Sequence, residues 1–266
     1  MTREQRYLFD LNGYLHLKGA LSEEELSSAR AAVESYLRTP EEELPEGFGS
    51  KNGRIFENAF AWDKSLESLV FHPSFWPIVK EFTRGKPRLM RGSMLVNMPF
   101  DDEVHAGRFH CAREDFGWFS TRYECRDGKI FCDDFVIFPY FYDVNPGDGG
   151  LAVLPGSHKS NFDRPESLFN NGYLEQGLPE YAVNVTPKAG DIVIISELLT
   201  HGALPWTPED RNRVVLILRY GPQYKGSQYI PAVISQRLSA ETRELIAVAS
   251  YTEEKEIMRR EVVILS

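Results

Sequence analysis

The chain has few cysteines, and they lack the spacing of a metal site. Only three occur in 266 residues, Cys111, Cys125 and Cys132, and no two of them form a Cys-x-x-Cys pair. An odd number of thiols without that spacing argues against a structural zinc and favours free cysteines in a reducing compartment.

Long apolar runs and blocks of positive charge are also lacking. The first 19 residues, MTREQRYLFDLNGYLHLKG, contain no apolar run of signal-peptide length. No stretch of the chain approaches the ~18 uncharged apolar residues of a membrane span. The net charge of −9 argues against nucleic acid as a partner. These absences predict a cytoplasmic protein that has neither nucleic acid nor a membrane as a partner; the oligomeric state is not indicated.

What the sequence does contain fits one large domain in three parts. Residues 1–86 are expected to be mostly helical packaging, because Ser22 and Glu25 form a capping-box pattern ahead of an apolar stripe at helical spacing. Residues 87–224 change to short β-rich stretches bounded by Gly, Pro, Asp or Asn, which is typical of a sandwich or barrel. Residues 225–266 are expected to form a helical tail.

Three motifs in the β-rich part carry a resemblance to a known family. They are PGDGGLAVLPGSHKSNF (146–162), KAGDIVIISELLTHGALPW (188–206) and DRNRVVLILRYGP (210–222). With the opening LFDLNGYLHLKGALSEEEL, they resemble the phytanoyl-CoA dioxygenase family of Fe(II)/2-oxoglutarate oxygenases over roughly residues 6–224. The resemblance implies a mainly β fold, a double-stranded β-helix (jelly roll) with flanking α-helices. It also implies Fe(II) and 2-oxoglutarate as cofactors, with O₂ and a small-molecule substrate.

The resemblance also implies the residues of the site. Such enzymes hold iron(II) with two histidines and a carboxylate on one face. His201, in an HG pair after the AGD strand, matches the distal histidine. Arg213 matches the arginine that binds the far carboxylate of 2-oxoglutarate, a task that suits a guanidinium because it binds a carboxylate in two places. Arg211 and Arg219 compete for this role, since strand alternation alone does not exclude Arg219.

The first iron ligand falls in the stretch FHCAREDF, residues 109–116. The family pattern is His-x-Asp, but His110 is followed by Cys111 and Ala112, so the acid is missing. His105 is the alternative and also lacks an acid two residues later. We favour His110 because of its spacing in the sequence from the turn CRDGKI. This spacing resembles that of a subgroup of the family that also lacks the usual aspartate.

Three hypotheses address the missing acid. In the first, Glu114, Asp115 or Asp134 completes the site of a hydroxylase-type oxygenase that acts on a C–H bond. In the second, Ala112 leaves a coordination position empty that a halide such as chloride, or water, fills, as in Fe(II)/2-oxoglutarate halogenases, where Ala or Gly replaces the acid. Two neutral imidazoles and dianionic 2-oxoglutarate balance Fe²⁺, so one further anion is tolerable. In the third, the barrel is a binding module without catalysis.

Other residues near the expected mouth have weaker assignments. His158, in PGSHK, is expected to be structural rather than a metal ligand. Aromatic and charged side chains around the mouth would suit a small polar or amphipathic substrate. They are Phe109, Phe116, Trp118, Phe119, Tyr123 and Trp206, with Arg113, Arg122, Asp133 and Asp134.

Overall fold

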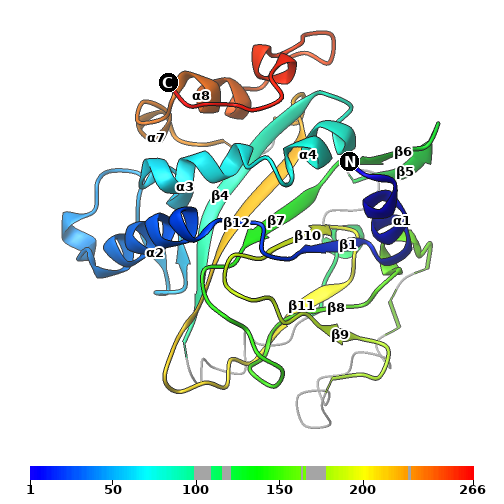
Figure 1. Ribbon diagram of the computed structural model, residues 1–266, viewed down its shortest axis with the longest axis horizontal. Helices are drawn as coiled ribbons and strands as arrows, with labels where there is room; N and C mark the ends of the chain where they lie inside the picture. Colours follow the sequence, from blue (N-terminus) through cyan, green and yellow to red (C-terminus); the bar gives the residue numbers. More distant parts are fainter. Residues whose placement is uncertain (99–108, 116–120, 163, 166–177, 227–228) are drawn as a thin grey trace.

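Two antiparallel β-sheets form the centre of the molecule (Figure 1). The computed structural model describes the chain except residues 99–108, 116–120, 163, 166–177 and 227–228. The large sheet has the strand order β1-β10-β7-β12-β4-β3-β2, the small sheet has the order β11-β8-β9, and β5 pairs with β6 in a separate hairpin. The strands are β1 (Tyr14–Leu17), β2 (Ser50–Lys51), β3 (Ile55–Phe56), β4 (Pro87–Asn97), β5 (Tyr123–Arg126), β6 (Lys129–Cys132), β7 (Phe135–Pro139), β8 (Gly150–Val153), β9 (Val183–Asn184), β10 (Ile192–Ser196), β11 (His201–Leu204) and β12 (Arg213–Pro222).

The alternation of side chains along β12 explains how the sheets pack. Val214, Leu216 and Leu218 belong to the apolar core that the large sheet shares with the helices. Val215 and Ile217 point the other way, into the core between the two sheets. Successive side chains of a strand point to opposite faces, so an apolar residue at every position predicts a strand that is covered on both sides. The jelly roll with flanking helices that the sequence predicted is confirmed.

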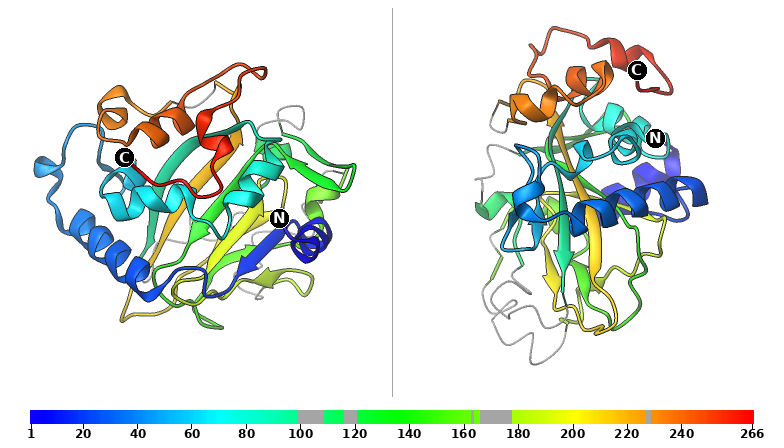
Figure 2. Two further views of the ribbon diagram at one scale, coloured as in Figure 1. Left: turned by 45° about the horizontal axis from the view of Figure 1, so that its top comes forward. Right: turned by 90° about the vertical axis from the view of Figure 1, so that its left-hand side faces the viewer.

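The helices cover the outer face of the large sheet. Figure 1 shows α3 and α4 lying across the long strands with α2 beside them, and Figure 2 shows them from two further directions. The helices are α1 (Arg3–Asn12), α2 (Glu23–Arg38), α3 (Lys64–Ser68), α4 (Trp76–Phe82), α5 (Ala112–Asp115), α7 (Ala232–Ser235) and α8 (Ala240–Ile246). The capping box predicted at Ser22 is confirmed: its side chain accepts from the N–H of Glu25, and the Glu25 carboxylate accepts from the N–H of Ser22.

The first 86 residues also contribute strands to the large sheet. β1 pairs with β10 from Tyr14 opposite Ile195 to Leu17 opposite Ile192. β3 pairs with β4, and β2 extends the same edge. The helical segment is therefore built into the jelly roll through its strands. Among the described residues, no helix has the length and apolar character to cross a membrane.

Candidate active site

His110 and His201 lie directly opposite each other on antiparallel segments. The N–H of His110 donates to the carbonyl of His201 at 2.9 Å, and the N–H of His201 donates back at 3.0 Å. Residues that exchange both hydrogen bonds in this way project their side chains from the same face. The two imidazole rings accordingly have centroids 4.3 Å apart. The structure thus brings together the two histidines that the sequence proposed as ligands.

The hydrogen bond of His201 leaves one ring nitrogen open for a metal. Its Nδ1 lies 2.7 Å from the carbonyl oxygen of Leu199, which can only accept, so Nδ1 carries the proton. The unprotonated Nε2 is then the donor atom, in the arrangement usual for a metal-binding histidine. Burial lowers the pKa of His201 to about 4, against the opposing charge of Glu197. His201 is therefore neutral near pH 7, the form that binds metals.

Ala112, where the family acid is missing, is completely buried beside Glu197. Its N–H donates to the backbone carbonyl of Glu197 at 2.6 Å. The Glu197 carboxylate is itself buried and pairs with Arg219 at 3.0 Å. Arg219 also donates to Asp134 at 3.4 Å. Burial raises the pKa of Asp134 to about 6, although Arg219 opposes the shift.

This arrangement leaves the third iron ligand undefined. Among the described residues, no three His, Cys, Asp or Glu side chains are grouped so that they could hold a metal. Asp134 interacts with Arg219. His105 and the side chains of Glu114 and Asp115 lie outside the described residues.

Glu197 is a residue of this region that the sequence analysis missed. The sequence gives one signal for it: Glu197 is the single acid in the mostly apolar stretch IVIISELL, and it lies four residues before His201.

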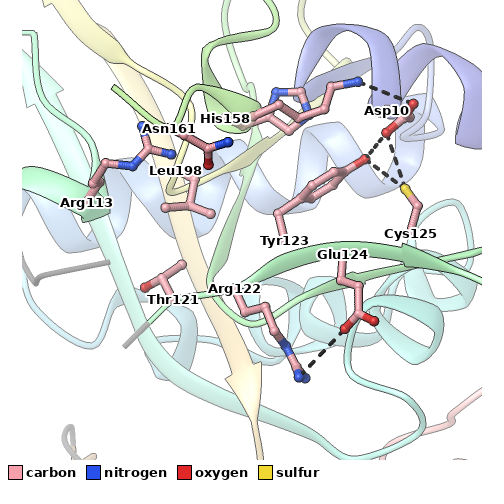
Figure 3. A pocket seen from close by; sticks show the side chains of 11 residues that line it. Asp10, Arg113, Thr121, Arg122, Tyr123, Glu124, Cys125, His158, Asn161 and Leu198 are labelled. Carbon is pink, nitrogen blue, oxygen red and sulfur yellow. Dashed lines mark hydrogen bonds and ion pairs between the residues drawn. The ribbon is translucent and has the colours of Figure 1, made fainter. Parts of the chain in front are cut away.

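A pocket of about 840 Å³ lies close to this region (Figure 3). Arg113 and Leu198 line it, and they follow Ala112 and Glu197 directly in the chain. Because Ala112 and Glu197 are hydrogen-bonded, the pocket begins one residue away from the position of the missing acid.

The structure places the residues expected around the mouth in different environments. Arg113, Arg122 and Tyr123 line the pocket. Phe109 and Trp206 are instead buried in the core. Phe116, Trp118 and Phe119 lie outside the described residues.

Arg213 is held between two polar partners on the inner face of the large sheet. Its Nη1 donates to Asn97 Oδ1 and its Nη2 to the hydroxyl of Tyr140, both at 2.9 Å. The third donor, Nε, is buried and has no partner among the described residues. Gly150 leaves space beside it, since a Cβ there would lie 3.0 Å from Nε. A buried guanidinium with an unused donor is suited to a carboxylate.

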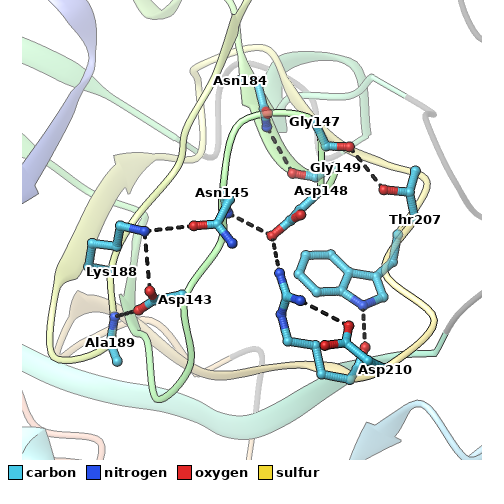
Figure 4. A network of polar contacts seen from close by, with 12 residues as sticks. Asp143, Asn145, Gly147, Asp148, Gly149, Asn184, Lys188, Ala189, Thr207 and Asp210 are labelled. Carbon is cyan, nitrogen blue, oxygen red and sulfur yellow. Dashed lines mark hydrogen bonds and ion pairs between the residues drawn. The ribbon is translucent and has the colours of Figure 1, made fainter.

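Arg219 and Arg211 do not share this setting. Arg219 lies on the same sheet face, but six residues along β12, which is ~20 Å in an extended strand. Arg211 precedes β12 and pairs with Asp148 at 2.6 Å and with Asp210 at 2.9 Å. Figure 4 shows Asp148 within this network at the turn before β8. Strand alternation would have placed Arg211 on the inner face, but it does not apply to Arg211, because β12 begins only at Arg213.

Comparisons with known proteins agree with this architecture. Residues 9–213 match the family described as phytanoyl-CoA dioxygenase (PhyH). The peroxisomal phytanoyl-CoA dioxygenase of Mus musculus is 26% identical over 225 residues, which is 76% of this chain and 63% of that enzyme. The probable phytanoyl-CoA dioxygenase of Caenorhabditis elegans is 24% identical over 229 residues, covering 76% of this chain and 70% of that protein. The chain thus spans under two thirds of the length of the mouse relative.

Solved structures show the same fold. HygX from Streptomyces hygroscopicus with iron bound is 25% identical, with a TM-score of 0.68 over 86% of this chain and 89% of HygX. EctD from S. alaskensis, with 2-oxoglutarate and 5-hydroxyectoine, is 17% identical, with a TM-score of 0.63 over 87% of this chain and 78% of EctD. Because the family match covers most of the sequence and contains both histidines, the chain belongs to the phytanoyl-CoA dioxygenase family.

Proposed function

We propose that this protein is an Fe(II)/2-oxoglutarate-dependent oxygenase that oxidises a C–H bond of a small molecule. The observation that carries the proposal is the direct pairing of His110 with His201, whose rings lie side by side. Two adjacent imidazoles are a donor set that suits iron. The iron that is bound in HygX supports the same metal here.

The residues present fit both iron and 2-oxoglutarate. His110 and His201 would hold the metal, with Nε2 of His201 as one donor. Arg213 would bind the far carboxylate of 2-oxoglutarate, using the unpartnered Nε in the space that Gly150 leaves. When bound, iron with 2-oxoglutarate and O₂ supplies the oxidative decarboxylation of 2-oxoglutarate to succinate and carbon dioxide and the oxidation of a substrate C–H bond.

The chain's own contribution is to orient these groups and to exclude water. Asn97 and Tyr140 hold the guanidinium of Arg213 in one orientation, so that little conformational freedom is lost when a carboxylate binds. Val215 and Ile217, further along the inner face, belong to the apolar core between the sheets. A dry interior of this kind strengthens the attraction between Arg213 and a carboxylate.

A halogenase is the second candidate function, and Ala112 is the observation that favours it. Ala112 is buried beside the histidine region, and within the described part of the chain no acid completes a three-residue metal group. The position of the missing acid would then accept water or chloride. We infer that this position is open, and whether water or chloride fills it would decide between hydroxylation and halogenation.

The cellular compartment stays a prediction. The relatives from Mus musculus and Homo sapiens carry the name peroxisomal.

Turnover of 2-oxoglutarate tests the function against a pure binding module. The protein should form succinate slowly without a substrate, and only with added iron.

Arg213→Ala should raise the 2-oxoglutarate concentration needed for half-maximal binding by about two to three orders of magnitude. Removing one partner of a buried ion pair costs ~3–5 kcal/mol, because the other charge is left unpaired. Arg211→Ala, its control, should be mild, since Arg211 pairs with Asp148 instead. Loss of binding in Arg219→Ala but not in Arg213→Ala would refute this assignment.

Gly150→Ala tests the space beside Arg213. Gly150 has φ +80° and Gly128 has φ +70°, but a Cβ at Gly128 meets nothing within 4 Å. Both alanine variants should lose about 1 kcal/mol of stability in urea unfolding, because the left-handed region is strained for residues with a Cβ. Only Gly150→Ala should also weaken 2-oxoglutarate binding, by about tenfold (~1.4 kcal/mol). Equal 2-oxoglutarate affinity in the two variants would place the cofactor elsewhere.

Ala112→Asp tests the open position. The new carboxylate should tighten iron binding by about tenfold, because it restores the anionic ligand that the family pattern supplies. It should also remove any effect of chloride on the charge-transfer band of the iron–2-oxoglutarate complex. Ala112→Asn, of nearly the same size but neutral, is the control and should give a smaller gain. Weaker iron binding in Ala112→Asp would show that another acid already completes the site.

A further inference from the structure

The pocket that begins beside Ala112 has two ends, and they differ in how their polar groups are satisfied (Figure 3). At one end, Asp10 accepts from the hydroxyl of Tyr123 at 2.7 Å and from the thiol of Cys125 at 3.2 Å. Lys159 lies 3.3 Å from the same carboxylate. The charges at this end are paired with one another and leave little for a ligand to bind.

The end beside Ala112 and Glu197 is different. Arg113, Thr121 and Asn161 line the pocket there, and Figure 3 shows them on the side away from Asp10 and Cys125. None of these three side chains makes a hydrogen bond or an ion pair with another described residue. Within the described part of the chain, this end therefore presents several unused donors, including one full positive charge.

His158 adds an unpartnered polar group that is buried in the same pocket. Only 2% of the residue is exposed, and neither ring nitrogen has a hydrogen-bond partner among the described residues. The backbone carbonyl of Asp10 is near enough to favour the protonated ring, yet burial has the larger effect and lowers the pKa of His158 to about 4. Buried polar atoms are rarely left without a partner, so an unpartnered imidazole in a pocket points to a bound molecule.

The charge of Arg113 defines the chemistry of that molecule. Arg122, which lines the same pocket, has two carboxylates nearby, Glu124 and Asp133, at 3.7 Å each. Arg113 has no such partner among the described residues, although it lines a pocket. A guanidinium binds an oxyanion through two parallel hydrogen bonds.

The size and place of the pocket connect it with the proposed chemistry. Its volume of about 840 Å³ falls within the ~300–1,000 Å³ usual for small-molecule sites. Arg113 directly follows Ala112, and Leu198 supplies an apolar wall directly after Glu197. A molecule anchored at Arg113 would thus bind one residue along the chain from the position of the missing acid.

We propose that this pocket receives the substrate and that Arg113 binds an oxyanion of it, a carboxylate or a phosphate. Thr121 and Asn161 would supply further hydrogen bonds, and Leu198 would contact the carbon skeleton. The substrate class is then a small organic acid or phosphate ester. The proposal rests on the proposed function, because it assigns this pocket to the substrate of that reaction.

Ligand-observed NMR on the full chain, with 2-oxoglutarate present at saturation to occupy Arg213, tests the charge requirement. The probes are benzoate and phenyl phosphate, with benzamide and benzylamine as neutral and cationic matches. At least one of the two anions should bind at least tenfold more tightly than benzamide and benzylamine, and the tighter anion identifies the oxyanion. Equal binding of benzoate, phenyl phosphate and benzamide, or preference for benzylamine, would overturn the proposal.

Substitutions in the same pocket test the residue. Arg113→Gln should weaken binding of the preferred anion at least tenfold, because a neutral amide replaces a charged donor pair. Arg122→Gln should leave binding unchanged, because Arg122 lines the same pocket but is already paired with acids. An unchanged affinity in Arg113→Gln, or an equal loss in both variants, would refute the role of Arg113.

The design separates this proposal from the proposed function. If the anion binds through Arg113 but no iron-dependent succinate forms, the pocket assignment stands and the oxygenase proposal fails. If succinate forms while anion binding ignores Arg113, the oxygenase proposal stands and the pocket assignment fails.

Discussion

The pair of backbone hydrogen bonds between His110 and His201 is the constraint on which the rest of the site depends. It fixes the register of two segments that are far apart in the sequence. A slip of one residue would turn one imidazole to the opposite face of the sheet and separate the donors. Two residues after His110, the N–H of Ala112 also bonds to the backbone of the second segment, at the carbonyl of Glu197. The histidine pair and the position of the missing acid are therefore set together by the backbone.

The inner face of β12 divides the interior into two regions of different charge. Arg213 lies at its start with the neutral partners Asn97 and Tyr140, and so it retains its full charge for an incoming carboxylate. Arg219 lies near its other end, where Glu197 and Asp134 already balance it. Valine and isoleucine side chains separate the two arginines. The two guanidiniums share a strand face but differ in what they are able to bind.

Much of this architecture follows from local patterns in the sequence. The Ser22 capping box, the continuous apolar run of β12 and the turns that flank the strands each depend on neighbouring residues, and the structure confirms them. The prediction that His110 and His201 are the metal ligands came from a family motif rather than from the periodicity of the sequence. Glu197 could not be foreseen in the same way, because its ion pair with Arg219 joins the turn after β10 to β12, and that contact depends on the tertiary fold. Likewise, nothing local distinguishes Arg211 from Arg213 until Asp148 and Tyr140 are placed.

The central claim is that His110 and His201 together hold an iron ion. Anomalous scattering at the iron edge, from crystals soaked with iron and 2-oxoglutarate, tests it most directly. The account predicts one strong peak at ~2.0–2.2 Å from a ring nitrogen of each histidine. It also predicts electron density for 2-oxoglutarate that extends from the metal to Arg213. A peak bound to only one of the two histidines, or located elsewhere in the molecule, would contradict it.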